Sequence, residues 1–66
     1  MLYLVNCDVC VHNYMDEDEN YNTNHIVESE NTDIAYDKII LHYDNKNAPY
    51  YKTYSVNINY VNELIT

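Results

Sequence analysis

Hydrophobic and polar side chains alternate along residues 1–13 of the chain. Successive side chains of a strand point to opposite faces, so this alternation gathers the apolar side chains on one face. The other face carries Asn6, Asp8 and His12, together with two leucines and Cys10. We therefore predict a strand over residues 1–13 that is buried through its apolar face. That face holds Tyr3, Val5, Cys7, Val9 and Val11.

The alternation stops after this strand and returns further along the chain. Residues 14–24 are acidic and rich in asparagine, which predicts a long loop or a hairpin connection. Residues 25–28 predict a short second strand. Residues 50–60 alternate again and predict the third strand, which the tail up to residue 65 either extends or follows as a last turn. One face of this strand holds Tyr54, Val56, Ile58 and Tyr60, and the other holds Ser55, Asn57 and Asn59.

Apolar residues spaced three or four apart predict one helix between the second and third strands. Asn31 or Thr32 can cap its start, because a short side-chain oxygen accepts a hydrogen bond from a first-turn N–H group. Asp33 then lies in the first turn, where the helix dipole favours a negative charge. The helix is expected to end near residues 44–45, and Pro49 prevents its continuation. The apolar stripe consists of Ile34, Ala35, Ile39 and Tyr43, with Tyr36 and Ile40 beside it.

The order strand–strand–helix–strand predicts an α+β fold in which one helix covers one face of a small antiparallel sheet. With 66 residues, the chain is expected to form a single domain, residues 1–66. A domain of this size is marginally stable and often depends on a disulfide, a metal or a second subunit. Nine tyrosines take the place of all other large aromatic residues. Such rings, each with a polar hydroxyl, suit a thin core and also an interface.

The sequence predicts no membrane-spanning segment, because it contains no run of about 18 apolar residues. Residues 1–5 lack the basic start and the small-residue cleavage site of a signal peptide. Two cysteines in a chain without an export signal are expected to be reduced thiols. The expected location is therefore the cytoplasm.

The formal net charge of −8 belongs to the first part of the chain. Nine of the eleven acids lie in residues 1–37, and no lysine or arginine precedes Lys38. Residues 38–66 hold two acids against three lysines, so the two parts carry −9 and +1. Direct nucleic-acid binding is not expected, because it depends on Lys and Arg that neutralise phosphates. The distribution favours a basic protein partner, while the alternative that the charge only maintains solubility stays open.

Two segments have part of the spacing of a metal site. Cys7 and Cys10 form a C-x-x-C inside a predicted strand, where they point to opposite faces and lack a second ligand pair. Residues 16–27 place Asp or Asn at the first, third, fifth and seventh positions of a calcium loop. Tyr21 replaces the glycine that this loop needs, and Val27 replaces its bidentate glutamate. We therefore predict no metal and no cofactor, with Cys7 as a small buried residue.

Catalytic patterns are also weak in this sequence. Ser29 and Ser55 lack the motif of a nucleophilic serine, and the chain has no glycine for a phosphate-binding loop. The paired carboxylates lie in a solvated loop, where their pKa values are not separated as acid–base catalysis requires. We therefore predict a binding protein and not an enzyme.

The short chain, its order of elements and the acids from Asp16 to Asp37 resemble the small acidic proteins with which bacteriophages take over their hosts. This group includes anti-CRISPR proteins, anti-restriction DNA mimics, and inhibitors of host polymerase or uracil-DNA glycosylase. The resemblance implies a stoichiometric inhibitor in the cytoplasm of a bacterial host cell. It would occupy the nucleic-acid site of a basic host protein, a CRISPR effector first of all or another nucleic-acid-binding enzyme.

The acidic side chains form the candidate binding site, because they would attract a basic partner and imitate phosphates. Tyr14 and Tyr21 are the expected anchors in this acidic part of the chain, since tyrosine is enriched at binding hot spots. The acids of the site are Asp16, Glu17, Asp18, Glu19, Glu28, Glu30, Asp33 and Asp37.

A structural or regulatory homodimer is the rival function. Such a dimer would pair an exposed strand edge, or bury the polar and aromatic face of the last strand, to compensate for the small core. Tyr50, Tyr51 and Tyr54 bear on this alternative, because they either cover the edge of the core or form an interface patch.

Overall fold

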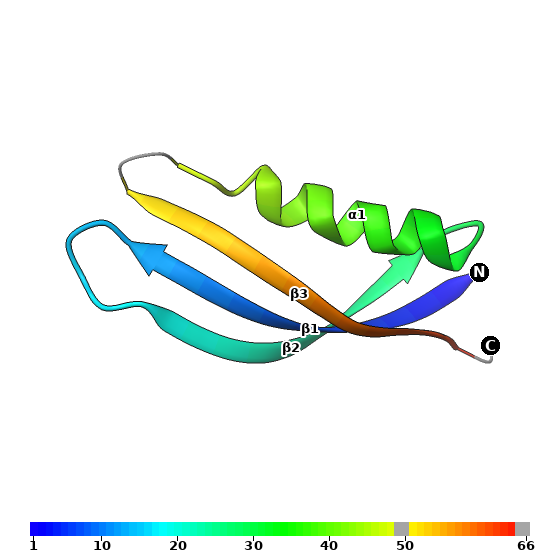
Figure 1. Cartoon of the computed structure of the whole chain (residues 1–66). Coiled ribbons are helices and arrows are strands. Elements are labelled where there is room, and N and C mark those ends of the chain that lie inside the picture. The colour runs from blue at the N-terminus through cyan, green and yellow to red at the C-terminus, as the bar shows by residue number, and fades with distance from the viewer. Residues whose placement is uncertain (49–50, 65–66) are drawn as a thin grey trace.

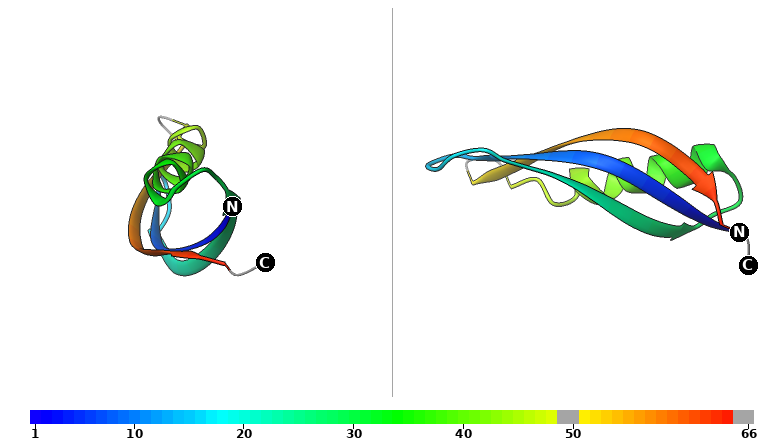
Figure 2. Two further views of the ribbon diagram at one scale, coloured as in Figure 1. Left: turned by 90° about the vertical axis from the view of Figure 1, so that its right-hand side faces the viewer. Right: turned by 90° about the horizontal axis from the view of Figure 1, so that it is seen from below.

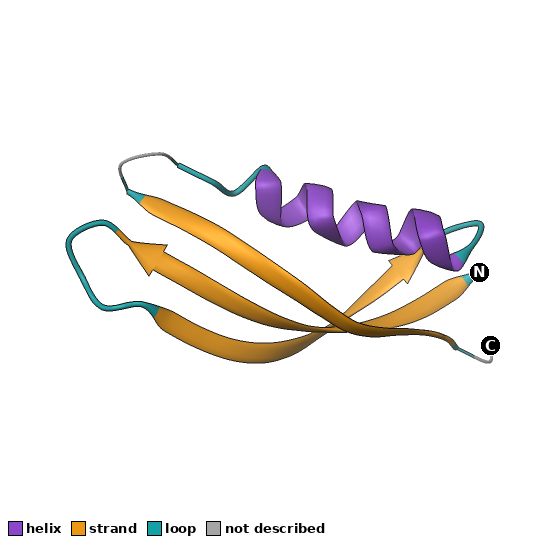
Figure 3. Cartoon of the chain, in the orientation of Figure 1, coloured by secondary structure: helices purple, strands orange, loops and turns teal. Residues whose placement is uncertain are grey.

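Three antiparallel strands form one sheet in the order β2-β1-β3, and a single helix lies across one face of it (Figures 1 and 3). The arrangement is that of a computed structural model, which describes residues 1–48 and 51–64. The predicted α+β fold with the order β-β-α-β is confirmed. Pro49, Tyr50 and residue 65, which entered the sequence predictions above, lie outside the described residues. The elements are β1 (Leu2–Asn13), β2 (Glu19–Glu28), α1 (Thr32–Asp44) and β3 (Lys52–Glu63).

The core lies between the central strand β1 and the helix α1. All five residues on the predicted apolar face of β1 are buried, and so are Ala35, Ile39 and Tyr43 of α1. The end view in Figure 2 shows the three strands curving beneath the helix. The helix therefore covers one face of the sheet, here called the inner face, and leaves the outer face uncovered. Half-buried side chains of the flanking strands close the core, namely Val27, Tyr54, Val56, Ile58 and Val61.

The helix begins where the sequence indicates. Of the two candidate caps, Asn31 is the one used, because its Oδ1 accepts a 2.9 Å hydrogen bond from the backbone N–H of Ile34. Asp33 lies in the first turn, where the positive end of the helix dipole favours a carboxylate. The last helical residue is Asp44, also as expected.

The apolar stripe of α1 is narrower than predicted. Ala35, Ile39 and Tyr43, which are four residues apart and form one row, are buried. Ile34 and Tyr36 remain 37% and 45% exposed. The assignment of Ile34 to the stripe is wrong, and Tyr36, expected beside the stripe, is exposed, because the single row faces the sheet.

β2 is longer than the sequence indicates. Residues 19–24, expected to lie in a loop, continue the strand and pair residue by residue with β1. The connection between the two strands shrinks to residues 14–18. Asparagine and glutamate are uncommon in strands, but backbone hydrogen bonds to β1 form whatever the side chain of the paired residue. Pairing with the central strand outweighs local propensity here, so the predicted short strand over residues 25–28 is wrong in length.

A β-bulge changes the faces of β3. β1 pairs with Ile58 and then with Tyr60, so Asn59 has no pairing position of its own. The extra residue reverses the alternation beyond it. Val61 is consequently half-buried against the core, whereas Tyr60 is 44% exposed on the outer face. The prediction that Tyr60 shares the buried face is wrong, and the strand continues to Glu63.

The molecule is a rod with principal-axis extents of 43 × 18 × 14 Å. The strands run along the rod, so the β1–β2 turn and the start of β3 lie at one end (Figure 1). The N-terminus, the start of α1 and the end of β3 lie at the other end. Within the described residues, no helix is long and apolar enough to cross a membrane.

Candidate functional site

The eight predicted acids form two separate groups at the two ends of the rod. Nine residue steps of β2 lie between the groups, which corresponds to about 30 Å at the usual rise of a strand. The structure therefore does not gather the predicted site into one surface. The turn group consists of Asp16, Glu17, Asp18 and Glu19, and the helix-start group consists of Glu28, Glu30, Asp33 and Asp37.

Local hydrogen bonds order the turn group while its carboxylates remain exposed. The Oδ1 atom of Asp16 accepts a 2.8 Å hydrogen bond from the backbone N–H of Glu17. The Nδ2 atom of Asn13 donates to the backbone oxygen of Glu17 at 2.9 Å. The Nδ1 atom of His12 lies 2.6 Å from Oδ1 of Asp18. These contacts fix the backbone of the turn and leave the acids facing solvent.

Large apolar side chains are exposed beside the turn group. Tyr14, Met15 and Tyr51 are 66%, 88% and 76% exposed. The backbone N–H of Tyr14 donates a 3.0 Å hydrogen bond to the backbone oxygen of Tyr51, which holds the start of β3 against the turn. The sequence prediction named Tyr14 as an anchor and Tyr51 as a candidate interface residue, and it missed Met15. Because β3 runs antiparallel to β1, its start lies beside the end of β1, and this places Tyr51 next to the turn.

The remaining tyrosines of the sequence predictions lie elsewhere. Tyr21 lies on the inner face of β2 opposite Val9 and is 41% exposed. The two predicted anchors, Tyr14 and Tyr21, therefore belong to different surfaces at the same end of the rod. Tyr54 is half-buried against the core and covers its edge, whereas Tyr51 does not.

The helix-start group gains one acid that the sequence prediction missed. Tyr3 pairs with Val27 on one side and with Glu63 on the other, so Glu63 lies at the same end of the sheet as Glu28. Lys38 is the nearest basic residue in the sequence, and its Nζ donates a 2.7 Å hydrogen bond to the backbone oxygen of Glu28. Among residues 1–48 and 51–64, no carboxylate forms an ion pair with a lysine.

A network of asparagine side chains occupies the outer face of the sheet. The Nδ2 atom of Asn6 on β1 donates to Oδ1 of Asn22 at 2.9 Å and to Oδ1 of Asn24 at 2.8 Å. The Oδ1 atom of Asn6 accepts from Nδ2 of Asn22 at 3.0 Å and from Nδ2 of Asn59 at 2.9 Å. Asn6 is only 8% exposed, although the helix does not cover this face. The bulge residue Asn59 thus joins the third strand to the network.

Asp8 lies beside this network and accepts hydrogen bonds from it. Its Oδ1 accepts from Nδ2 of Asn22 at 2.8 Å. The amides of Asn22 and, to a smaller extent, Asn59 stabilise the carboxylate and lower the pKa of Asp8. Asn57 donates from Nδ2 to Oδ1 of Asn59 at 3.1 Å. Asparagines at every second position of β2 and at positions 57 and 59 are the signal in the sequence that could reveal the network.

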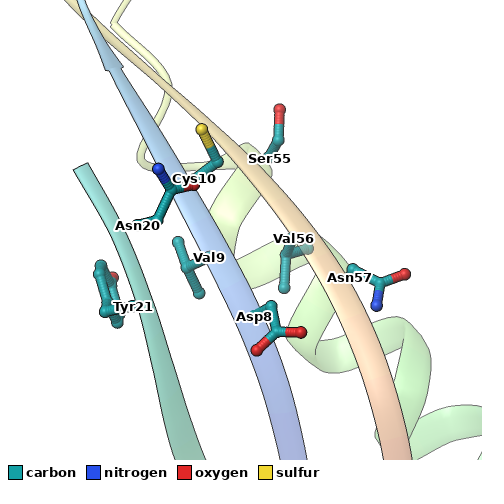
Figure 4. Close-up of a pocket in the computed structure, with 8 residues that line it drawn as sticks. All are labelled: Asp8, Val9, Cys10, Asn20, Tyr21, Ser55, Val56 and Asn57. Atoms are coloured by element: carbon teal, nitrogen blue, oxygen red, sulfur yellow. The ribbon is translucent and has the colours of Figure 1, made fainter. Parts of the chain in front are cut away.

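An open groove of about 500 Å³ runs across the outer face next to Asp8 (Figure 4). Two rows of cross-strand neighbours form it, because Asp8 pairs with Asn57 and Cys10 pairs with Asn20 and Ser55. The sequence prediction did not identify this groove. Its size falls in the range of about 300–1,000 Å³ that is usual for ligand sites.

No protein-family model, curated protein or solved structure matches the chain. Its function is therefore inferred from the geometry and charge of its surfaces.

The two cysteines lie on opposite faces of β1, as predicted. Cys7 is fully buried in the core, and burial raises the pKa of its thiol. Cys10 is half-exposed on the outer face and lines the groove. Among the residues that the structure describes, no three or more His, Cys, Asp or Glu side chains are grouped so that they could hold a metal ion.

Proposed function

We propose that the protein is a stoichiometric inhibitor that binds the basic nucleic-acid-binding surface of a host defence protein and blocks access of nucleic acid. The observation that carries this proposal is the placement of carboxylates at both ends of a rod. The turn group and the helix-start group lie about 30 Å apart along β2. One turn of B-DNA measures about 34 Å. Basic patches that contact a duplex at successive turns would therefore meet both groups.

The distribution of charge supports the same class of partner. β1 and β2 contain no lysine or arginine. In the described parts of the chain, the carboxylates of both groups are free of lysine partners. Apart from Asp18, which lies against His12, these carboxylates attract an external cation without first losing an internal one, which raises the association rate and makes binding sensitive to salt.

The exposed side chains of Tyr14, Met15 and Tyr51 support a role of the turn in binding. Charged pairs at the rim of an interface contribute little affinity, and buried aromatic anchors contribute most of it. The turn combines four acids with three large apolar side chains. In this proposal the acids steer the encounter and the apolar side chains hold the complex.

The proposed partner is a CRISPR effector or another nucleic-acid-binding enzyme of a bacterial host, as the resemblance to phage takeover proteins implies. The proposed location is accordingly the cytoplasm of that cell. Inhibition by occupancy needs no catalytic step, no cofactor and no direct contact with nucleic acid.

Neutralisation of each acidic group tests the proposal. One variant carries D16N, E17Q, D18N and E19Q, another carries E28Q, E30Q, D33N and D37N, and the control D44N changes an acid outside both groups. The measurements are the affinity for purified RNA-guided effectors and the displacement of labelled duplex from them, at two salt concentrations. We expect each fourfold variant to bind at least about tenfold more weakly, with a smaller salt dependence, and D44N to bind like the wild type.

Circular dichroism of each variant separates lost binding from lost fold. Binding that is indifferent to both fourfold changes and to salt would contradict the proposal. So would failure of the wild type to displace duplex from any effector in the panel.

A homodimer is the second candidate function, and the free edges of the sheet favour it. In the described residues, β2 and β3 are edge strands, each with one side unpaired. Free edges can pair with a second copy. Light scattering coupled to size exclusion distinguishes the two functions, because a tight dimer that is indifferent to salt favours this candidate over the inhibitor.

A further inference from the structure

The carboxylate of Asp8 offers free hydrogen-bond acceptor positions to the groove. Both N–H groups of Asn22 are used inside the network, one on Asp8 and one on Asn6. Asn59 and Asn57 also donate within the network, to Asn6 and Asn59. An ionised carboxylate has about four acceptor positions. Asp8 therefore retains acceptor capacity towards the groove after its amide partners are counted.

The groove also carries a negative charge without a cation beside it. Asp8 is exposed, and its pKa is lowered by amide donors, so the carboxylate is ionised at neutral pH. Within the described residues, no lysine or histidine forms an ion pair with Asp8. The groove is therefore built to receive a positively charged group that donates several hydrogen bonds.

We propose that the groove beside Asp8 binds the guanidinium group of an arginine side chain from a protein partner. Guanidinium is planar, carries five N–H donors and has no acceptor, which fits a site of carboxylate and amide oxygens. A lysine ammonium is a compact and strongly hydrated charge, and it would gain less in an open groove.

A β-bulge at Asn59 lies next to this site. A bulge adds one residue to a strand and often re-aims a side chain beside a functional site. Here it turns Tyr60 to the outer face, while Asn59 donates a hydrogen bond to Asn6 and lies beside Asp8. The expectation that the partner is basic rests on the proposed function. Binding of a guanidinium group in the groove can be measured without that partner.

A short peptide of three arginines tests the inference, with a peptide of three lysines for comparison. Nuclear magnetic resonance of the isotopically labelled chain locates the binding site. Alkylation of Cys10 supplies a second readout, because a ligand in the groove protects this thiol while Cys7 stays buried. We expect the arginine peptide to shift the amide signals of Asn20, Ser55 and Asn57 and to slow alkylation, and the lysine peptide to bind at least about fivefold more weakly.

Two variants of the groove and one control complete the test. D8N keeps an oxygen for the hydrogen bond from Asn22 but removes the charge. We expect it to lower the affinity for the arginine peptide about tenfold or more. S55W fills the groove from an exposed position and should block binding while Asp8 remains. D44N removes the same charge from the end of α1, outside the groove and both acidic groups, and should bind the arginine peptide within about twofold of the wild type.

Equal binding of both peptides, equal affinity of D8N and D44N, or signal shifts confined to the turn would overturn the inference. A groove that binds the arginine peptide, in a protein that displaces no duplex, keeps this inference and removes the proposed inhibitor function. Displacement of duplex that is unchanged by D8N and S55W keeps the function and removes the groove from it.

Discussion

The Nε2 atom of His25 on β2 lies 2.6 Å from the hydroxyl oxygen of Tyr43 on α1, and this hydrogen bond ties an edge strand to the helix. The ring of His42 lies 5.6 Å from that of His25, measured between centroids. The Nζ atom of Lys46 lies 5.5 Å from the centroid of Tyr43. Burial lowers the pKa of His25, and the positive charges of His42 and Lys46 lower it further. The folded protein therefore favours neutral His25.

The free energy of unfolding should decrease as the pH is lowered from about 7.5 to about 5. The pKa of His25 in the folded protein lies below its ordinary value of 6.5, so the unfolded chain binds the proton first. The contribution of neutral His25 is present in full above pH 6.5 and is lost as the pH falls towards the folded-state pKa. Urea unfolding followed by circular dichroism at a series of pH values measures this dependence.

Two histidine variants provide the control for this pH dependence. H25Q keeps a polar group at the position but does not titrate, so its stability should change less with pH than that of the wild type. H12Q removes a histidine that is exposed and paired with Asp18 in the turn, and it should keep the wild-type slope. A wild-type slope in H25Q would contradict the assignment to His25.

The two thiols should differ in reactivity in the folded protein. Cys7 is fully buried and burial raises its pKa, so little thiolate forms and reagents have no access. Cys10 is half-exposed on the outer face. A thiol reagent should therefore modify Cys10 rapidly and Cys7 only after denaturation. Mass spectrometry of the C7S and C10S variants can assign each modification to its cysteine. Modification of both thiols at similar rates would show that the inner face of the sheet opens.

Strand β1 and its buried face were predictable because period-two alternation there is uninterrupted from Tyr3 to Val11. The helix start was predictable because a cap acts locally, through Asn31 and the N–H of Ile34. The acidic residues could be identified directly from the sequence, but their separation into two groups could not be predicted. That separation depends on the length of β2, which pairing with β1 sets and local propensity opposes.

The outer face was hidden from the sequence for another reason. Its asparagines come from β1, β2 and β3, so the network exists only once the strand register is known. The register itself contains a bulge at Asn59, and a one-residue change moves the following side chains to the other face. Tyr60 was misplaced for this reason, whereas the groove beside Asp8 was missed because its residues come from three different strands.

The bulge predicts an unequal cost for two neighbouring substitutions. Val61 is half-buried against the core, so V61N should lower the free energy of unfolding by about 1–2 kcal/mol through loss of apolar burial. Tyr60 is 44% exposed on the outer face, so Y60N should cost less. Urea titrations of both variants measure the difference. The opposite order would mean that β3 has regular alternation and no bulge at Asn59.

Replacement of Asn6 should destabilise the sheet although no core side chain changes. Asn6 is 8% exposed and accepts hydrogen bonds from Asn22 and Asn59 while donating to Asn22 and Asn24. N6A removes all of these hydrogen bonds together, and the amides of Asn22, Asn24 and Asn59 must then bond to water. We expect this to lower the free energy of unfolding by about 1–2 kcal/mol.

Asn62 provides the matched control for Asn6, since it is an exposed asparagine of the same sheet that pairs with β1 beyond the bulge. N62A should change the free energy of unfolding by less than about 0.5 kcal/mol in the same urea titration. The N–H signals of Asn22 and Asn59 side chains should shift in N6A and stay in place in N62A. Equal stability of the two variants would mean that the amides of the outer face are held by water and not by one another, and that the floor beside Asp8 is not a fixed site.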